Sequence, residues 1–190
     1  MSARADQPHI GLVVEGRGDE QSIPLLLRRY LHSKSEYRDL LGSPFNADGK
    51  SNITRDDGIE ALITAAANRP GCVGVIVFVD SDDDCPVELG KKLLDRCLQV
   101  ISRTVVIVAI DREFEDWLYQ SVETLELKSG GEYLASTRGL NYISENLGCK
   151  YVKTVHQARL TQKMDLMVAA SRDKNLTRAF KKLDELVLLV

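Results

Sequence analysis

Two uninterrupted apolar runs limit the folds that this chain can adopt. Residues 73–79 (VGVIVFV) and 104–110 (TVVIVAI) carry no charged side chain, and each is followed directly by an acidic residue. Runs of this length, rich in β-branched residues, are typical of strands that are buried on both faces of a sheet. Such strands occur in parallel sheets that have helices on both sides. The two runs therefore predict an α/β fold.

The segments around these runs support a parallel sheet. Residues 9–14 (HIGLVV) form a third short apolar run, and helical spacing of apolar residues begins near Asp19, residue 58 and residue 87. The resulting order of strands and helices predicts a central, mostly parallel sheet that is flanked by helices. Residues 43–56 are polar, and we expect a loop or a short edge strand there.

The chain changes in character after about residue 125. Residues 128–139 are rich in Gly and Ser and predict a loop, and helices are expected at 141–147, 158–170 and 175–188. Between residues 150 and 182, basic side chains greatly outnumber acidic ones. We therefore expect a metal-binding core at residues 1–125 and a basic, helical C-terminal extension at residues 126–190 that packs on the core.

The composition is that of a soluble globular protein, with 44% hydrophobic residues. The formal net charge of -3 gives no global sign of nucleic-acid binding, although a nuclease can gather acids at a metal site and bases nearby. No signal peptide is recognisable in the polar first eight residues, no run is long enough to span a bilayer, and the four cysteines form no CxxC pair. We expect a cytoplasmic protein without membrane contact, with reduced thiols and no structural zinc.

Acidic residues follow all three expected strands. Glu15 ends the first, Asp80 and Asp82 follow the second, and Glu113 and Glu115 come shortly after the third. Parallel strands end at the same edge of a sheet, so these side chains share one rim. Crowded carboxylates repel one another unless a cation is present, and their oxygens are the ligands that Mg²⁺ and Mn²⁺ prefer. We therefore expect a divalent metal at Glu15, Asp80 and Asp82, with a merely solvated turn as the alternative.

Two further acids are candidates for the same rim. Asp19 lies one helical turn beyond Glu15, where it can face the same metal or the second metal of a paired site. Glu113 and Glu115 point in different directions on a strand end or on a helix, so one of them is expected to face the rim. We favour Glu115 as a ligand of a second metal, with a structural salt bridge as the alternative.

Basic residues and glycines allow several interpretations. Lys153 can neutralise a phosphate or an oxyanion, or it can be an ordinary solvated lysine. His156 is more typical of a helix entry than of a base. The basic helices can contact nucleic acid or simply face solvent. Gly16 and Gly18 belong to no complete dinucleotide-binding motif and the chain has no P-loop, so ATP hydrolysis would belong to a partner.

Five motifs, in their order along the chain, resemble one family. Residues 14–19 (VEGRGD) look like the glutamate motif of Toprim domains, and residues 79–84 (VDSDDD) resemble the Toprim DxD motif. Residues 24–29 (PLLLRR), 113–118 (EFEDWL) and 151–157 (YVKTVHQ) resemble further motifs of an uncharacterised bacterial Toprim-like family. That family is similar to the Toprim domain of the overcoming-lysogeny-defect nucleases. The resemblance covers nearly the whole chain.

The resemblance implies a Toprim-like, Rossmann-like fold with Mg²⁺ or Mn²⁺ as cofactor. It implies a nuclease or phosphotransferase that acts on nucleic-acid phosphodiesters, in bacterial defence beside an ATPase partner. Catalytic roles are implied for Glu15 and Lys153, and metal binding for Glu15, Asp19, Asp80, Asp82 and Glu115. Substrate contacts are expected at Arg17, Lys153 and His156.

The sequence departs from this family in two places and leaves other functions open. Asp19 stands where relatives more often have Glu, and residues 175–180 lack the serines that relatives often carry. The main alternative is a non-catalytic Toprim-like regulatory or interaction module of an ATPase system. A small phosphatase ranks lower, because the DxDx[TV] nucleophile pattern is absent. The substrate, its strandedness and homo-oligomerisation are not fixed by the sequence.

Overall fold

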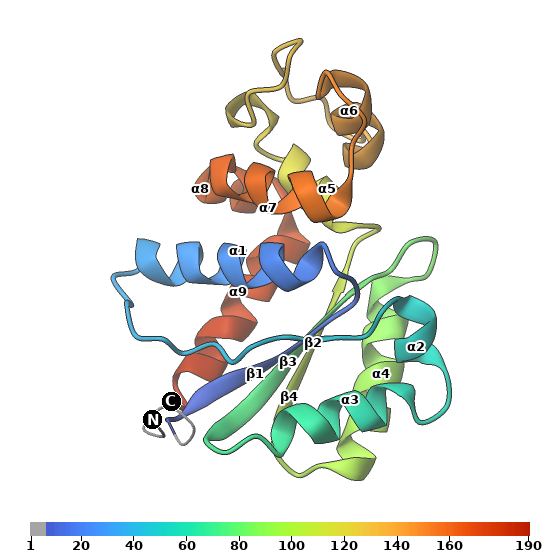
Figure 1. Cartoon of the computed structure of the whole chain (residues 1–190), viewed down its shortest axis with the longest axis vertical. Coiled ribbons are helices and arrows are strands. Elements are labelled where there is room, and N and C mark those ends of the chain that lie inside the picture. Colours follow the sequence, from blue (N-terminus) through green and yellow to red (C-terminus); the bar gives the residue numbers. More distant parts are fainter. Residues whose placement is uncertain (1–6) are drawn as a thin grey trace.

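The computed structural model describes residues 7–190, so most of the polar start on which the signal-peptide expectation rests lies outside the described residues. Four strands form one sheet in the order β2-β1-β3-β4, and every neighbouring pair is parallel (Figure 1). Their bounds are β1 (His9–Val14), β2 (Phe45–Asn46), β3 (Cys72–Asp80) and β4 (Thr104–Ile110). The predicted α/β class, with a parallel central sheet flanked by helices, is confirmed.

The helices occupy the connections between strands and the whole C-terminal part. The first four are α1 (Asp19–Ser33), α2 (Lys50–Thr54), α3 (Gly58–Ala67) and α4 (Pro86–Val100). After β4 come α5 (Phe114–Tyr119), a 3₁₀ turn at Val122–Thr124, α6 (Gly139–Asn146), α7 (Lys153–Lys163), α8 (Leu166–Arg172) and α9 (Lys174–Val187). Within the described residues, no helix combines the length and the apolar character that a bilayer span requires.

The two faces of the sheet carry separate parts of the core. Side chains with even numbers on the strands, such as Leu12 and Ile76, pack with α1, α5 and α9. Side chains with odd numbers, such as Val13 and Val77, pack with α3 and α4. Figure 1 shows these two groups of helices on opposite sides of the sheet. Because successive side chains alternate in direction, burial on both faces requires the uninterrupted apolar runs of the sequence.

The C-terminal helices contribute to the same core as the strands. Leu160 on α7 and Leu176, Phe180 and Leu183 on α9 are buried in the cluster that covers the even-numbered face. Helix α7 packs against α1, and α9 returns along the sheet so that the C-terminus lies near β1 (Figure 1). The predicted boundary after residue 125 stays a prediction, because the residues beyond it complete the cover of this face.

Two parts of the chain differ from the expected elements. The segment expected as a loop or a short edge strand contains the two-residue edge strand β2 and, in addition, the short helix α2, which was not expected. The helix expected at 158–170 begins earlier, at Lys153, and is interrupted near Asp165. The Asp165 side chain accepts hydrogen bonds from the backbone N–H groups of Met167 and Val168, both at 3.0 Å. It therefore caps a new helix, α8, in place of continuing the old one.

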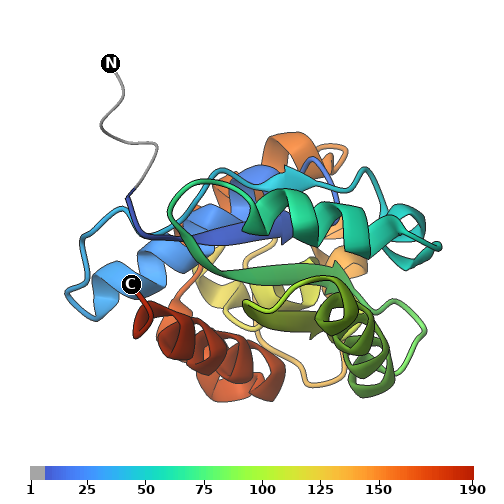
Figure 2. The same ribbon diagram turned by 90° about the horizontal axis from the view of Figure 1, so that it is seen from below.

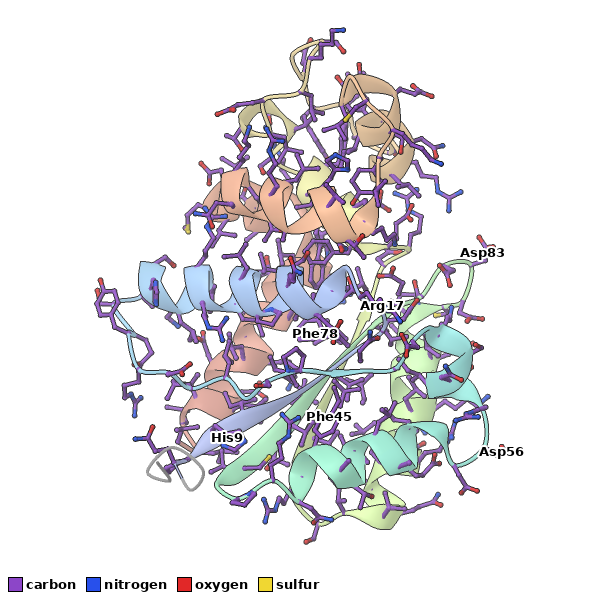
Figure 3. The ribbon with its side chains drawn as sticks, viewed as in Figure 1. His9, Arg17, Phe45, Asp56, Phe78 and Asp83 are labelled. Atoms are coloured by element: carbon purple, nitrogen blue, oxygen red, sulfur yellow. The ribbon has the colours of Figure 1, made fainter. Side chains whose placement is uncertain are left out.

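The strand order creates a switch point beside β1. The chain passes from β1 through α1 to β2 on one side of β1, and then through α3 to β3 on the other side. In open α/β sheets, ligands bind at such a point, outside the carboxyl ends of the strands. Figure 3 shows Arg17 and Asp83 near this end of the sheet and His9 at the opposite end.

Candidate acidic site at the carboxyl edge

The acidic side chains that end β1 and β3 meet at the switch point. Glu15 directly follows β1, and its Oε2 accepts the backbone N–H of Asp80 at 3.0 Å. Asp80 is the last residue of β3 and is only 6% exposed. Its Oδ1 accepts the backbone N–H of Phe114, at the start of α5, at 3.1 Å. The two strand ends and α5 are thereby held in one place.

Lys153 lies among these acids. Its Nζ is 3.3 Å from Oε2 of Glu115 and 3.6 Å from Oδ2 of Asp80. Glu115 lies in the first turn of α5 and is completely buried, whereas 44% of the Lys153 side chain is exposed. Lys153 is the first residue of α7, so one ammonium group links the ends of β3, α5 and α7. The structure thus places Lys153 beside the predicted metal ligands.

Asp19 joins the same group through the first turn of α1. Its Oδ2 accepts the backbone N–H of Gly16, and its Oδ1 accepts Nε2 of Gln157, both at 3.0 Å. Gln157 is fully buried on α7. We call Glu15, Asp19, Asp80 and Glu115 the acidic cluster. It surrounds Lys153 and is assembled from β1, α1, β3 and α5.

Two uncharged residues that the sequence interpretation did not assign to the site hold the acidic cluster in position. Tyr151 donates its hydroxyl to Oε1 of Glu115 at 2.6 Å, and Gln157 donates to Asp19 as described. Both belong to the 151–157 motif that also supplies Lys153. Neither side chain is ionised near neutral pH, so a search for charged residues does not find them. Their position in the 151–157 motif is the only feature of the sequence that points to them.

Burial raises the pKa values of three acids in the cluster. Loss of hydration is the largest cause for Glu15, Asp19 and Asp80, and the pKa of Asp80 lies well above its ordinary value. Neighbouring carboxylates raise these pKa values further, and Lys153 opposes the rise in each case. Lys153 therefore offsets only part of the rise that burial and the neighbouring carboxylates cause in these pKa values.

The pKa of Lys153 is shifted by the same neighbours. Burial alone lowers the pKa of its ammonium group, but the carboxylates of Glu115, Asp80 and Asp19 outweigh that effect and raise the pKa above its ordinary value. Lys153 is therefore positively charged throughout the physiological range.

Asp82 is separated from the acidic cluster, although the sequence paired it with Asp80. Its φ of 52° is left-handed, and its carboxylate lies 3.0 Å from Nζ of Lys50. Lys50 also contacts the Asp84 carboxylate at 2.8 Å and donates to the carbonyl of Ser81 at 2.6 Å. The Asp82 side chain is 57% exposed, yet its charge still raises the pKa of Glu15. Metal binding by Asp82 stays a prediction that requires this side chain to turn from Lys50.

The two remaining candidates for substrate contact have local partners. The Arg17 side chain is 76% exposed and lies 3.5 Å from the Asp48 carboxylate, at the rim. The Nδ1 atom of His156 accepts the backbone N–H of Val152, the residue just before α7, at 2.9 Å. This contact matches the helix-entry role that the sequence favoured over a base. The exposed Arg17 side chain can meet a ligand at the rim, whereas His156 keeps its Nδ1 contact and has only Nε2, 3.6 Å from Sγ of Cys149, to offer a ligand.

Glu113 and Glu115 differ in their ion pairs, and the preference for Glu115 as a ligand of a second metal stays a prediction. Glu115 contacts Lys153, whereas the nearest cation to Glu113 is Arg138, whose Nε lies 3.9 Å from Oε1 of Glu113. Glu113 is 8% exposed, and burial raises its pKa, with a further rise caused by Glu115. Of the two glutamates, Glu115 is the one that belongs to the acidic cluster.

The acidic cluster has the ligand type of a divalent-cation site, but its carboxylates are not arranged around one metal position in the described residues. Among residues 7–190, no three His, Cys, Asp or Glu side chains are already arranged around one metal position. The donors are all carboxylate oxygens, which suit Mg²⁺ and Mn²⁺. Oε2 of Glu115 is buried and faces Nζ of Lys153 at 3.3 Å, and desolvation disfavours the charge on three other acids. Binding of Mg²⁺ or Mn²⁺ by Glu15, Asp19, Asp80 and Glu115 therefore stays a prediction.

Gly18 allows α7 to approach the turn that carries Glu15 and Asp19. A Cβ atom at Gly18 would lie 2.1 Å from Oε1 of Gln157 and 3.0 Å from Cβ of Lys153. We expect Gly18→Ala to push α7 away, with a loss of about 1–3 kcal/mol in the free energy of unfolding. Urea denaturation measures this loss. Gly16→Ala is the matched control, since its Cβ would meet nothing closer than Asp19 Oδ2 at 3.6 Å. Equal stability of both variants would contradict the prediction.

Comparison of the chain with protein-family models, curated proteins and solved structures found no match. The Toprim-like family membership therefore stays a prediction from the five motifs.

Proposed function

We propose that the chain is a Mg²⁺- or Mn²⁺-dependent nuclease or related phosphotransferase with a Toprim-like fold. The observation that carries the proposal is the convergence of four carboxylates on Lys153 at the switch point of a parallel sheet. Sites with carboxylates and a nearby cation suit displacement at phosphorus, where negative charge must be held in the transition state. Action on nucleic acid, a defence role and an ATPase partner are the parts of the proposal that rest on the motifs.

The residues have distinct roles in this proposal. Asp80 and Glu115, with Glu15 and Asp19, would hold the cation, which would supply Lewis-acid polarisation of the phosphoryl group and activation of a water nucleophile there. Lys153 holds a positive charge beside them, directed at the phosphate. Glu15 is less buried than Asp80 and its pKa is raised, so it is also suited to exchange a proton with the leaving oxygen.

The fixed contacts of the site support the same roles. Tyr151 orients the Glu115 carboxylate, and Gln157 orients that of Asp19, so neither acid has to be ordered when a ligand arrives. Arg17, exposed at the rim, is placed to meet the phosphate backbone outside the cluster.

A non-catalytic module is the second candidate, and a specific observation favours it. Lys153 already supplies a positive charge to the cluster, and no metal position is preformed among the described residues. In that case the carboxylates and Lys153 are a structural ion-pair network, and the chain acts through its surface as a regulator of an ATPase. Calorimetry with Mg²⁺ and with Mn²⁺ separates the two: absence of binding at millimolar metal favours the module.

Glu15→Gln tests the catalytic proposal directly. The substitution keeps the shape of the side chain and an acceptor for the Asp80 N–H but removes the charge, so the fold is retained. We expect metal-dependent cleavage of single- and double-stranded DNA and RNA to fall by about a hundredfold or more. Glu145→Gln, the same change at an exposed site on α6, is the control and should cleave normally. Full cleavage by Glu15→Gln would refute the proposal.

A further inference from the structure

The outer edge of β4 has backbone groups that no strand pairs with in the described part of the chain. β4 is the last strand of the sheet, with β3 on one side. The Ile110 carbonyl accepts the Ser81 N–H, so it points toward β3, whereas the Ala109 carbonyl accepts Nδ2 of Asn175 at 2.9 Å and points outward. Because backbone groups alternate in direction along a strand, Val105 and Ile107 also present their N–H and C=O groups outward.

A groove of about 210 Å³ lies beside residues 107–109 at this edge. Figure 2 shows β4 at the lower edge of the sheet, between α9 and α4. The groove is lined by β4 itself, by Pro86 and Val87 of α4, and by Asn175, Arg178, Ala179 and Lys182 of α9. Its α4 side is apolar, with Val87 71% exposed, and its α9 side carries two cations and no acid.

The two cations differ in their partners. Lys182 lies 2.7 Å from the Glu185 carboxylate, on the same helix. Arg178 is exposed and takes part in none of the ion pairs or side-chain hydrogen bonds found among residues 7–190. At one end of the edge, the Asn175 side chain makes the two backbone hydrogen bonds that a neighbouring strand would make: it donates to the Ala109 carbonyl and accepts the Asp111 N–H at 3.4 Å. Beyond Asn175, toward Val105, no strand of the described residues pairs with the outward backbone groups of β4.

We propose that this groove binds an extended, acidic segment of a partner protein, which adds to the sheet as a strand beside β4. Strand addition draws affinity from backbone hydrogen bonds and specificity from alternate side chains. Ile107 and Ala109 face the α4 side, because odd-numbered residues belong to the core that α3 and α4 cover. The added strand would therefore place apolar side chains against Val87 and Ile107, and carboxylates against Arg178 and Lys182.

A second copy of this chain fits the groove less well than an acidic segment. Pairing β4 with β4 of another copy in a continuous antiparallel sheet places the two α9 helices on the same face. The Arg178 and Lys182 side chains of the two copies would then line one junction, where like charges repel. An acidic strand instead neutralises both cations.

The groove lies along the edge of β4 and contains no member of the acidic cluster, so this proposal does not depend on the proposed function. Nuclease activity could be absent and the groove still bind its segment. The reverse also holds, because an active site at the strand ends needs no strand beside β4.

A labelled peptide of alternating Glu and Val, seven residues long like β4, tests the proposal by fluorescence anisotropy. We expect saturable, submillimolar binding to the full chain. The double variant Arg178→Glu, Lys182→Glu should weaken binding about tenfold or more. Both side chains are exposed, so the fold is retained. Lys174→Glu, Lys181→Glu, the same charge change at exposed α9 positions outside the groove, is the matched control and should bind normally.

Other outcomes overturn the proposal. Equal weakening in both double variants would mean that only the overall charge attracts the peptide. Unchanged binding of a peptide with every backbone nitrogen methylated would exclude strand addition, because such a peptide has no N–H donor on either edge. No binding of the unmodified peptide, together with a stable dimer in sedimentation velocity, would assign the groove to a second copy of the chain.

Discussion

Lys153→Met is expected to destabilise the protein at neutral pH and to abolish metal-dependent cleavage. Without the ammonium group, Asp80 and Glu115 lose the cation within 3.6 Å, and the charges of the acidic cluster repel one another without compensation. Removing one partner of a buried ion pair costs about 3–5 kcal/mol, and because 44% of the Lys153 side chain is exposed we expect about 1–3 kcal/mol. Urea denaturation at pH 7 measures this change.

The pH dependence of this loss follows from the direction of the shifts. The raised pKa of Lys153 means that its stabilisation is fully present below the ordinary lysine pKa and is lost only as pH rises through the higher folded value. On the alkaline side, the loss in Lys153→Met should therefore persist to about pH 9, below the ordinary lysine pKa. It should shrink on acidification, as Asp80, Asp19 and Glu15 protonate at pH values above their ordinary range.

Divalent metal gives the same variant a second readout. If the acidic cluster binds Mg²⁺, millimolar Mg²⁺ should raise the stability of Lys153→Met more than that of the wild type, because the metal replaces the missing positive charge. Lys150→Met is the matched control, since Lys150 is exposed, lies three residues earlier and makes none of the ion pairs found in the described chain. A variant that is as stable as the wild type with and without Mg²⁺ would rule out this account of Lys153.

The sheet could be predicted because strands that are buried on both faces consist of uninterrupted apolar residues. β1 and β4 have the predicted bounds, and β3 is one residue longer at each end. β2 could not be located with the same certainty, because it has two residues at the edge of the sheet and both are only half-buried. A strand of that length leaves no alternating or continuous pattern, and its place is set by pairing with Val13 and Val14.

The sequence could predict the part of the candidate site that depends only on the order and direction of the strands. Parallel strands bring Glu15 and Asp80 to one edge regardless of the loop conformations. In the structure, the Glu15 carboxylate accepts a hydrogen bond from the Asp80 N–H. The direction of Asp82 depends on a left-handed turn and on Lys50, which comes from α2, a helix that the polar 43–56 segment did not reveal. Periodicity could not place Tyr151 and Gln157 either, because their contacts depend on how α7 packs against α1 and α5.

Asp80→Asn is expected to make the fold more stable and the site inactive. The pKa of Asp80 lies well above its ordinary value because desolvation outweighs the attraction of Lys153, so the ionised carboxylate destabilises the folded state. Asparagine keeps an oxygen that can accept the Phe114 N–H and removes the buried charge. We expect a gain of about 1 kcal/mol in the free energy of unfolding near pH 7.

The sign of this effect can be checked against pH. A carboxyl group with a raised folded pKa binds more protons in the folded state, so wild-type stability falls as pH rises from the ordinary aspartate pKa to the folded value. The gain in Asp80→Asn should thus be small near pH 4, grow through this window and stay constant above it. Denaturation at a series of pH values gives the curve, and Asp56→Asn, at an exposed residue labelled in Figure 3, is the control that should follow the wild type.

Activity should move in the opposite direction in the same variant. Loss of this buried carboxylate removes a proposed metal ligand, so we expect Mg²⁺ affinity to fall about tenfold or more and cleavage about a hundredfold. A stability gain with loss of metal binding would identify Asp80 as a residue whose buried charge is kept for function. If Asp80→Asn were instead destabilised at every pH, with Mg²⁺ binding unchanged, Asp80 would be a structural partner of Lys153, and the non-catalytic module would be the better description of the chain.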